Sequence, residues 1–340
     1  AVNPDYTINL STLPNGLATA GSPNCVAMFG NDLFVSITAA NQRIYKFPNY
    51  GQDPAASIAN VSQITNAGND YVGIAFDTSG NLFASEGSYL DTHLVKYTKA
   101  SNYATRIDLG NGGLTSYFAN ITFDSSGNLW ATDYKNSRVV AILGGDLNST
   151  NAPFHALNTN VVNWTTNGGH TSNLTASLQA LSVTKAFAKP EGIAFDSTGK
   201  LWIANNNDSG TNAAPTLVGI TTQMQSTVLL SSNTDVNPNL TNSIYGFKVY
   251  NMPSSVNGRG QFGGMQIDKS IDRIYVNEEI SGSGIWIDIA TIADTPNDFN
   301  AVKLNITSTN PGNGGIYLAA SSQILAVDEN PIADSFVAIY

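Results

Sequence analysis

One segment of about fourteen residues recurs along the chain, and this repetition limits the possible folds more than any other feature. The clearest copy reads GIAFDSTGKLWIAN at 192–205. Similar copies read GIAFDTSGNLFASE at 73–86 and NITFDSSGNLWATD at 120–133. The fold must therefore use one structural unit several times.

Each copy has the pattern of a β-hairpin. Apolar residues alternate on both sides of a central Asp-Ser-Thr-Gly, as expected for two short strands joined by a four-residue turn. In the clearest copy Asp196 opens the turn, where its carboxylate can accept backbone N–H groups, and Gly199 supplies the positive φ. The same pair recurs as Asp77/Gly80 and Asp124/Gly127.

A third strand follows each hairpin, and a fourth is visible in places. Third strands are expected at 93–98, 138–143 and 216–221, and a fourth at 104–109. Looser copies of the hairpin lie at 25–38, 264–278 and 315–329. Repeated four-stranded units of about 40–50 residues are the signature of a β-propeller.

We therefore predict an all-β fold: a six-bladed β-propeller of four-stranded antiparallel blades. It forms a single domain over 1–340, with blades starting near 25, 73, 120, 192, 264 and 315. The segment 5–12 resembles the outer-strand segment 104–109, and 335–340 has the pattern of a third strand. The N-terminal strand is thus expected to join the last blade and close the ring.

The repeated residues resemble the NHL repeat. The pattern GIAFDxxGxLWxA followed by DYKNSRV at 133–139 carries this resemblance, and ANQRIYKF at 40–47 fits it. The resemblance covers about residues 25–330 and implies the wider group of six-bladed propellers with SMP-30/gluconolactonase-like and virginiamycin B lyase-like members. It implies a fold rather than a function, because one propeller fold serves binding, scaffolding and catalysis.

Composition narrows the classes of partner and location. The formal charge of −10 and the pI near 4.6 would repel a phosphate backbone, so no nucleic-acid partner is expected. No apolar run is long enough for a transmembrane segment. Charged residues make up 12% of the chain, about half the usual share of ~25%. Together with a start at Ala1, this favours a secreted, periplasmic or cell-surface protein whose signal peptide has been removed.

Extra length is expected on one face of the ring. In a propeller the inner strand starts at the upper face and the second strand returns to it. Connections between blades, and between strands two and three, therefore share this face. Insertions are predicted there at 144–189, 205–215 and 231–262, and long loops on a rigid scaffold often carry binding sites.

The position just before each inner strand should point into the upper end of the central channel. In SMP-30-like lactonases, as the resemblance implies, this ring holds a divalent cation through Glu, Asn and Asp. The aligned positions here are Asn24, Val72, Ala119, Glu191, Gly263 and Gly314. Glu191 and Asn24, with Asn120 one place further on, are thus the tentative ligands for Ca²⁺ or another divalent cation. Alternatively, Glu191 only lines a wet channel.

Other polar and aromatic residues allow two interpretations. Polar residues at the upper end of the second strands either add acidity to the mouth or cap the hairpins; they are Glu86, Asp133, Asn205, Glu278 and Glu279. In DYKNSRV, the residues that look like the structural part of the NHL pattern are Asp133, Asn136 and Arg138. Tyr71 and Tyr245 precede inner strands and could stack on a sugar or grip a peptide, or pack between blades. His155 and His170 are expected as polar loop residues, and neither they nor His93, which opens the third strand expected at 93–98, stand at a channel position.

Three functions remain open. The first is a secreted or cell-surface NHL-like propeller that acts as a binding or assembly scaffold through its upper face, with a protein, a carbohydrate or its own copies as partner. The second is a divalent-metal-dependent lactonase, hydrolase or lyase that uses Glu191, Asn24 and Asn120. The third is a plain structural domain. The incomplete ligand ring favours the first.

Overall fold

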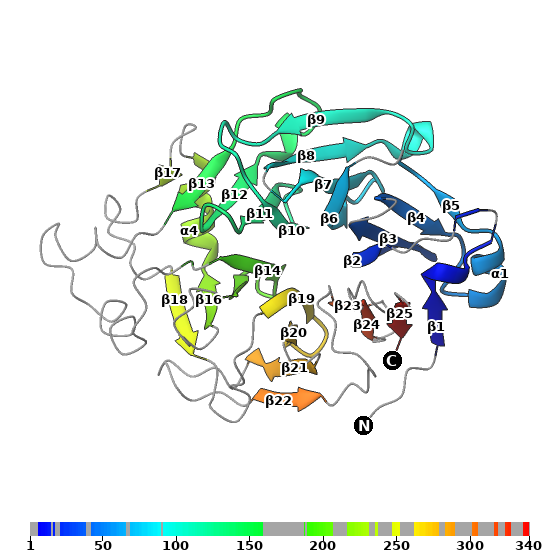
Figure 1. Cartoon of the computed structure of the whole chain (residues 1–340). Coiled ribbons are helices and arrows are strands. Elements are labelled where there is room, and N and C mark those ends of the chain that lie inside the picture. Colours follow the sequence, from blue (N-terminus) through cyan, green and yellow to red (C-terminus); the bar gives the residue numbers. More distant parts are fainter. Residues whose placement is uncertain are drawn as a thin grey trace, which may run out of the picture.

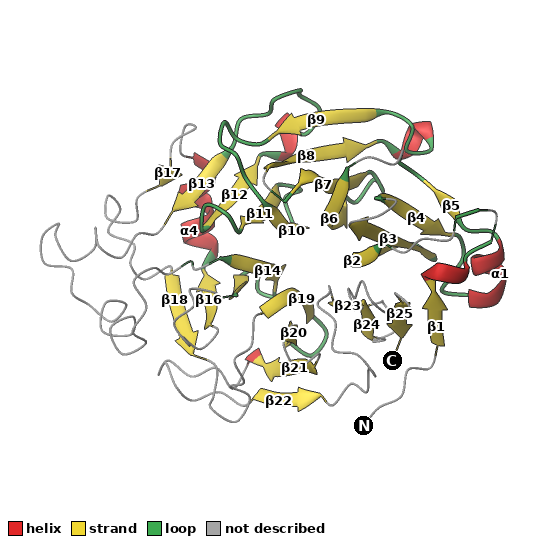
Figure 2. Ribbon diagram, viewed as in Figure 1, coloured by secondary structure: helices red, strands yellow, loops and turns green. Residues whose placement is uncertain are grey.

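The structure of the chain, a computed structural model, is dominated by β-strands arranged around a central axis (Figures 1 and 2). It describes residues 6–14, 16–17, 21–38, 42–65, 69–89, 91–158, 187, 189–206, 216–230, 235–236, 247–251, 262–278, 283–289, 301–304, 316–318, 324–327 and 336–339. Within these ranges no helix is both long and apolar enough to span a membrane.

The strands form six sheets, numbered here in the chain order of their innermost strands. Sheet 1 contains β2 (Ser22–Phe29), β3 (Asp32–Thr38), β4 (Arg43–Phe47) and β5 (Ser62–Gln63). Sheet 2 contains β6 (Asp70–Phe76), β7 (Leu82–Ser88), β8 (Asp91–Tyr97) and β9 (Arg106–Gly110). Sheet 3 contains β10 (Phe118–Phe123), β11 (Leu129–Asp133), β12 (Arg138–Ile142), β13 (His155–Asn158) and β17 (Asp235–Val236).

The later sheets follow the same plan. Sheet 4 contains β14 (Pro190–Phe195), β15 (Leu201–Asn205), β16 (Thr216–Ile220) and β18 (Phe247–Asn251). Sheet 5 contains β19 (Phe262–Asp268), β20 (Arg273–Glu278), β21 (Ser283–Asp288) and β22 (Ala301–Leu304). Sheet 6 contains β23 (Ile316–Leu318), β24 (Ile324–Val327), β25 (Phe336–Ile339) and β1 (Tyr6–Asn9). The helices are α1 (Pro54–Ala59), α4 (Thr222–Leu230) and the 3-10 turns η1 (Leu10–Thr12), η2 (Lys99–Ser101) and η3 (Gly144–Asp146).

Pairing within the sheets is antiparallel, except that β17 lies parallel to β13 at the edge of sheet 3. An all-β propeller with four-stranded antiparallel blades is thereby confirmed. The inner strands contact one another in the order β2, β6, β10, β14, β19 and β23, and β23 also contacts β2. The first strand of the chain pairs with the last, with Tyr6 opposite Ile339.

The repeated hairpin turn has the chemistry predicted for it. The Asp77 carboxylate accepts the backbone N–H groups of Ser79 (3.0 Å) and Asn81 (2.9 Å), and Gly80 has a φ of +82°. Asp124 and Asp196 form the same turns, and each also accepts an indole N–H, from Trp130 at 3.1 Å and Trp202 at 2.8 Å respectively. Strand one, turn and strand two are thus locked together locally.

The core lies between neighbouring sheets. Trp130 of sheet 3 is fully buried against apolar residues of sheet 4, including Ile193 and Ile203. Trp202 of sheet 4 packs in the same way on sheet 5, against Met265. Each buried Trp removes roughly 150–250 Å² from water, so these rings contribute substantially to the apolar contacts joining sheets 3, 4 and 5.

Two of the three predicted insertions contain regular structure. β13 lies within 144–189 and β18 within 231–262, and each is an outer strand of its sheet. The sequence missed both because these strands are short and polar stretches flank them. The range 205–215 starts at the last residue of β15. Within the predicted insertions, 159–186, 188, 207–215, 231–234, 237–246 and 252–261 lie outside the described residues.

Candidate functional site

Five inner strands carry a β-bulge at the channel position predicted from the sequence. The register shifts fall between Pro23 and Cys25, Tyr71 and Ile74, Phe118 and Asn120, Pro190 and Gly192, and Phe262 and Met265. The aligned positions Asn24, Val72, Ala119, Glu191 and Gly263 all lie inside these shifts, and Gly314 lies outside the described residues. A bulge changes the direction of a side chain relative to its strand, so the upper mouth is built from irregular positions.

At three of these bulges, a hydroxyl group from the preceding sheet holds the backbone. Thr132 Oγ1 accepts the N–H of Asn120 at 3.1 Å and donates to the carbonyl of Glu191 at 2.8 Å. Equivalent donations run from Ser36 to Val72 O at 2.8 Å and from Ser85 to Phe118 O at 2.5 Å. Backbone positions at the mouth are therefore fixed from the neighbouring sheet.

Glu191 is the centre of a polar cluster between sheets 3 and 4. Its carboxylate Oε2 accepts the side-chain N–H of Asn206 at 2.6 Å, and the backbone N–H of Asn206 donates to Lys189 O at 3.0 Å. Lys189 has a φ of +50°, uncommon for a residue other than glycine. Its ammonium lies 5.4 Å from the ring centre of Tyr134. We call Glu191, Lys189, Asn206 and Tyr134 the Glu191 cluster.

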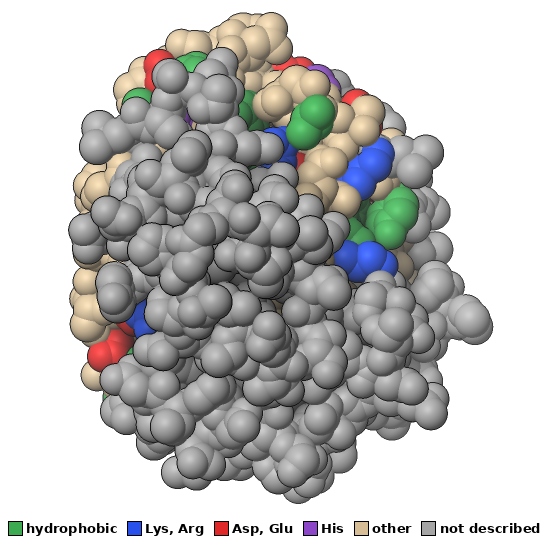
Figure 3. All heavy atoms as spheres, turned by 90° about the vertical axis from the view of Figure 1, so that its left-hand side faces the viewer, with side chains coloured by type: hydrophobic (Ala, Val, Ile, Leu, Met, Phe, Trp, Pro, Cys, Tyr) green, Lys and Arg blue, Asp and Glu red, His purple; other side chains and the backbone are tan. Residues whose placement is uncertain are grey.

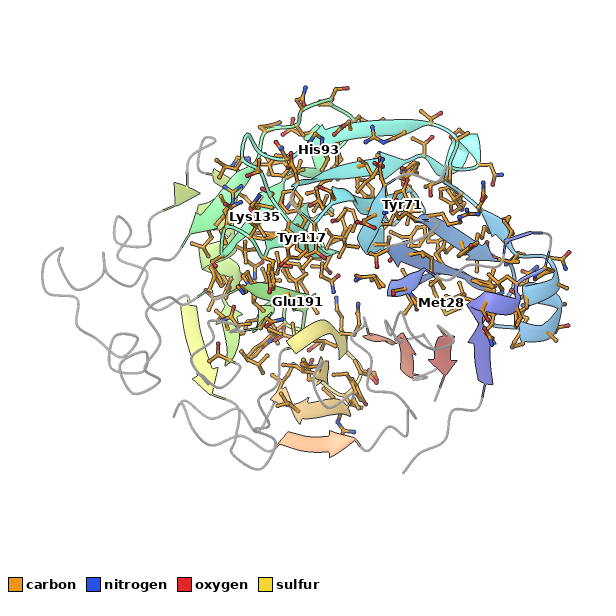
Figure 4. The ribbon with its side chains drawn as sticks, in the orientation of Figure 1. Met28, Tyr71, His93, Tyr117, Lys135 and Glu191 are labelled. Carbon is orange, nitrogen blue, oxygen red and sulfur yellow. The ribbon has the colours of Figure 1, made fainter. Side chains whose placement is uncertain are left out.

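The Glu191 cluster gives the mouth charges of both signs. Glu191 and Lys189 are both partly exposed, and Figure 4 shows Glu191 at the inner side of the ring near β14. A carboxylate only accepts hydrogen bonds and an ammonium only donates them. Lys189 and Asn206 escaped the sequence analysis. The one sequence signal for Asn206 as a site residue was its position next to Asn205, which had been selected.

Other residues selected from the sequence are less accessible. Tyr71 is only 2% exposed and lies in the core between sheets 1 and 2, so its prediction as a mouth residue is wrong. Apolar neighbours from both sheets surround its ring. Asn120 is buried, and its side-chain oxygen accepts the N–H of Ile121 at 2.8 Å, which keeps that oxygen in the backbone network. Asn24 is partly buried at its bulge, and Tyr245 lies outside the described residues.

The donor set fits a divalent cation poorly. Such an ion takes several hard oxygen ligands, but Val72, Ala119 and Gly263 offer no side-chain oxygen at the ring positions. In the part of the chain that the structure describes, no three His, Cys, Asp or Glu side chains lie close enough to share a metal ion. Glu191 and Asn24 are the only described ring positions with a side-chain oxygen.

Three of the polar residues at the upper ends of the second strands, Glu86, Asp133 and Asn205, are buried in hydrogen-bond networks, which agrees with the structural interpretation. Glu86 is buried and accepts from Tyr97 (2.6 Å), Asn69 (2.6 Å) and Arg106 (3.0 Å). Asn205 is buried and donates to Thr216 at 2.9 Å. The Glu278 side chain and all of Glu279 lie outside the described residues.

Asp133 follows the NHL-like interpretation. It is fully buried, and it accepts from Arg138 Nε at 2.9 Å and from the Asn136 side chain at 2.8 Å. His155 differs from expectation, because it begins β13 and is buried, so it is not a loop residue. His93 lies on β8, in the predicted third strand, with its Nδ1 2.9 Å from Asp108 Oδ1. His170 lies outside the described residues.

A cleft of about 350 Å³ lies on the opposite, lower face, between the turns of sheets 3 and 4 and helix α4. Hydroxyl groups dominate its polar lining, as at Ser126 and Thr222. Its two carboxylates, Asp124 and Asp196, each accept at least three hydrogen bonds from their own turns and from indole groups. These acids hold the turns together, and the Glu191 cluster remains the better candidate site.

No protein-family model matches the chain, and no curated protein matches it. Solved structures do resemble it. Virginiamycin B lyase from Staphylococcus aureus is similar with a TM-score of 0.55 and 11% identity, over 98% of this chain and 87% of that one. A gluconolactonase from Xanthomonas campestris gives 0.54 and 10%, over 98% and 88%. A chain of a nidogen–laminin complex gives 0.52 and 11%, over 91% and 86%.

This chain has the β-propeller fold of those proteins. The predicted superfamily resemblance to lyase-like and gluconolactonase-like propellers is confirmed at the level of fold. Identities of 10–11% carry no information on substrate. The NHL resemblance stays a prediction, because no family model matches the chain.

Proposed function

We propose that this chain is a binding module, a single closed ring of six sheets that contacts its ligand at the upper face around the Glu191 cluster. The continuous contacts among the six inner strands and the pairing of β1 with β25 support the closed ring. A secreted, periplasmic or cell-surface location belongs to this proposal, supported by the low share of charged residues. Cell fractionation of the source organism tests that location.

The observation that carries the proposal is the hydrogen bond between Asn206 and Glu191. A partly buried carboxylate that accepts a 2.6 Å hydrogen bond from an amide has a fixed direction, and a carboxylate group can accept several hydrogen bonds. The neighbouring Lys189 sits in a left-handed conformation, and such conformations cluster at ligand sites. Fixed polar groups beside aromatic rings are typical of ligand pockets.

The test is a thermal-shift screen with three classes of probe: divalent cations, neutral and acidic oligosaccharides, and short peptides. We expect at least one organic probe to raise the Tm, and Glu191→Gln to remove that rise. Lys269→Gln alters the lower cleft and serves as the matched control, which should keep the rise. If Lys269→Gln removes the rise and Glu191→Gln keeps it, the ligand binds the lower cleft and the proposal is wrong.

A divalent-metal-dependent lactonase, hydrolase or lyase is the second candidate. The carboxylate at a mouth bulge and the fold shared with a gluconolactonase and a lyase favour it. Calorimetric titration with Ca²⁺, Mn²⁺ and Zn²⁺ and a lactone-hydrolysis assay test it. Metal binding and turnover that both disappear in Glu191→Gln would support the enzyme, and failure of both would leave binding as the better function.

A further inference from the structure

Three tyrosines on segments of sheets 2 and 3 form a continuous series of ring contacts. The rings of Tyr89 and Tyr117 lie 4.9 Å apart between centroids, and those of Tyr117 and Tyr134 lie 5.8 Å apart. We call these residues the tyrosine stripe. Tyr89 is 62% exposed, and Leu114, on the segment before Tyr117, is 46% exposed. Tyr134 belongs to both the tyrosine stripe and the Glu191 cluster.

Hydrogen bonds tie the segments that carry the stripe to one another. Thr92, just after the turn of Tyr89, donates its backbone N–H to Ser116 O at 2.7 Å. Asp91 accepts the backbone N–H of Ser116 at 3.3 Å. The backbone N–H of Tyr134 donates to Tyr117 O at 2.9 Å. The three rings thus stand on a single connected framework.

The buried Asp133 anchors this framework. It accepts from the Ser116 hydroxyl at 2.9 Å and from the Tyr117 backbone N–H at 3.3 Å, in addition to the Arg138 guanidinium at 2.9 Å. A surface that is already ordered loses little conformational entropy when a ligand binds. Tyrosine side chains lower this entropy cost further, because they offer a large contact area with few rotatable bonds.

We propose that the tyrosine stripe binds an extended, neutral glycan chain whose hydroxyl groups reach the Glu191 cluster. This inference rests on the proposed function and names the ligand class. Tyrosine combines an apolar ring with a polar tip, which matches the C–H faces and hydroxyl rims of sugar rings. Figure 4 shows Tyr117 and Lys135 at this side of the ring, and Figure 3 shows hydrophobic side chains beside Lys and Arg side chains on the described surface.

The charges at the cluster favour a neutral ligand. Lys189 and Glu191 place one charge of each sign at the cluster, so the cluster has no net charge that would attract an ion, and the net charge of −10 would repel an anionic ligand. Each sugar hydroxyl both donates and accepts, so it can satisfy the carboxylate and the ammonium alike. Strand addition by a peptide is not available here, because β7 and β11, which lead into the turns of the stripe, are already paired on both sides.

Calorimetry with cellohexaose, xylohexaose, mannohexaose and chitohexaose tests the inference, with hexagalacturonate and a proline-rich peptide as the competing classes. We expect one neutral hexasaccharide to bind. Tyr89→Ala should weaken it about five- to tenfold through loss of one stacking contact, and Tyr89→Phe should retain most of the affinity. Ile271→Ala, at a side chain 53% exposed on a lower-face turn of sheet 5, is the matched control and should change nothing.

Three results would overturn the inference. The first is no binding of any neutral hexasaccharide by the unaltered protein. The second is binding that Tyr89→Ala and Tyr117→Ala both leave unchanged while circular dichroism shows them folded. The third is preferential binding of the peptide or hexagalacturonate. If Glu191→Gln abolished binding of the peptide or hexagalacturonate, the glycan inference would be wrong but the proposed binding function would stand. Failure of the inference can therefore be distinguished from failure of the proposed function.

Discussion

The side-chain amide of Asn206 donates a 2.6 Å hydrogen bond to the carboxylate of Glu191. Its backbone N–H also donates to Lys189 O, two residues before that glutamate. One residue at the end of strand two thus fixes both charged members of the cluster. The following predictions test the framework that positions them.

Gly73→Ala should destabilise the ring where two inner strands meet. A Cβ at Gly73 would lie 2.8 Å from Asn120 Cα and 3.0 Å from Ala119 O, both backbone atoms that cannot rotate away. We expect a loss of about 1–3 kcal/mol in the free energy of unfolding, measured by urea denaturation. Gly145→Ala meets nothing within 4 Å and should be close to neutral. Equal losses of stability in the two variants would contradict the inference that the close approach of the two inner strands excludes a side chain at Gly73.

Thr132→Val should cost about 1–3 kcal/mol, because it leaves a backbone N–H and a carbonyl at the mouth without their hydroxyl partner. Thr132→Ser keeps that hydroxyl and loses one methyl group, so its cost should be below about 1 kcal/mol. Urea denaturation of both variants provides the measurement. If Ser were as damaging as Val, packing of the methyl group would explain the effect, and the inter-sheet hydrogen bond would not.

Asp108 should add a small acid-sensitive contribution to stability. Partial burial acts to raise the pKa of Asp108, but hydrogen bonds from His93 and the Gly110 backbone, with the charge of Arg106, outweigh it and hold the pKa below its ordinary value. The stabilisation is therefore full above the unfolded pKa of ~3.9 and is lost as the pH falls through the folded pKa.

The side chain of Asp108 is 30% exposed, so the contribution should stay below about 1 kcal/mol. Asp108→Asn should reduce stability at neutral pH and leave it nearly unchanged in strong acid. The measurement is the unfolding midpoint of the unaltered protein and of Asp108→Asn, from neutral pH to strong acid. A difference that grew on acidification would have the opposite sign and would refute the assignment.

Tyr97 should remain protonated in the folded protein at alkaline pH. Burial, followed by the proximity of Tyr71 and Glu86, raises the pKa of Tyr97 well above its ordinary value. Its contribution to stability is present below the unfolded pKa of ~10 and is lost as the pH rises towards the folded pKa.

Phenolate absorbance measures this directly. Tyr97→Phe should lower the titration amplitude of the unfolded chain by one tyrosine and leave the native amplitude unchanged. It should also cost about 1 kcal/mol through loss of the hydrogen bond to Glu86. A native amplitude that fell by one tyrosine would show that Tyr97 ionises in the folded state.

Local features could be predicted from the sequence. The Asp77 turn depends on residues within four positions of one another, so its chemistry is readable in a single copy. Aligning the copies also located the mouth positions, because every unit must start its inner strand at the same place. The alignment did not show that these positions are bulges. The repeats differ in length, so one extra residue in a strand cannot be recognised from the sequence.

Features set by contacts between sheets could not be predicted. Tyr71 stands just before the predicted inner strand, but in the structure it lies within β6 and apolar residues of two sheets surround it. Lys189 meets Tyr134 only after two sheets pack together. The outer strand β13 carries no strong apolar alternation and was absorbed into a predicted insertion.

The hydroxyl contacts between sheets affect how the residues at the mouth can change in evolution. Because Ser36, Ser85 and Thr132 donate hydrogen bonds to backbone carbonyls of the next sheet, these bonds do not depend on which side chains stand at the mouth positions. Asparagine, valine, alanine and glutamate already occupy equivalent places on it. Selection, or a protein engineer, can therefore exchange these side chains one at a time and vary what the ring recognises without rebuilding the ring itself.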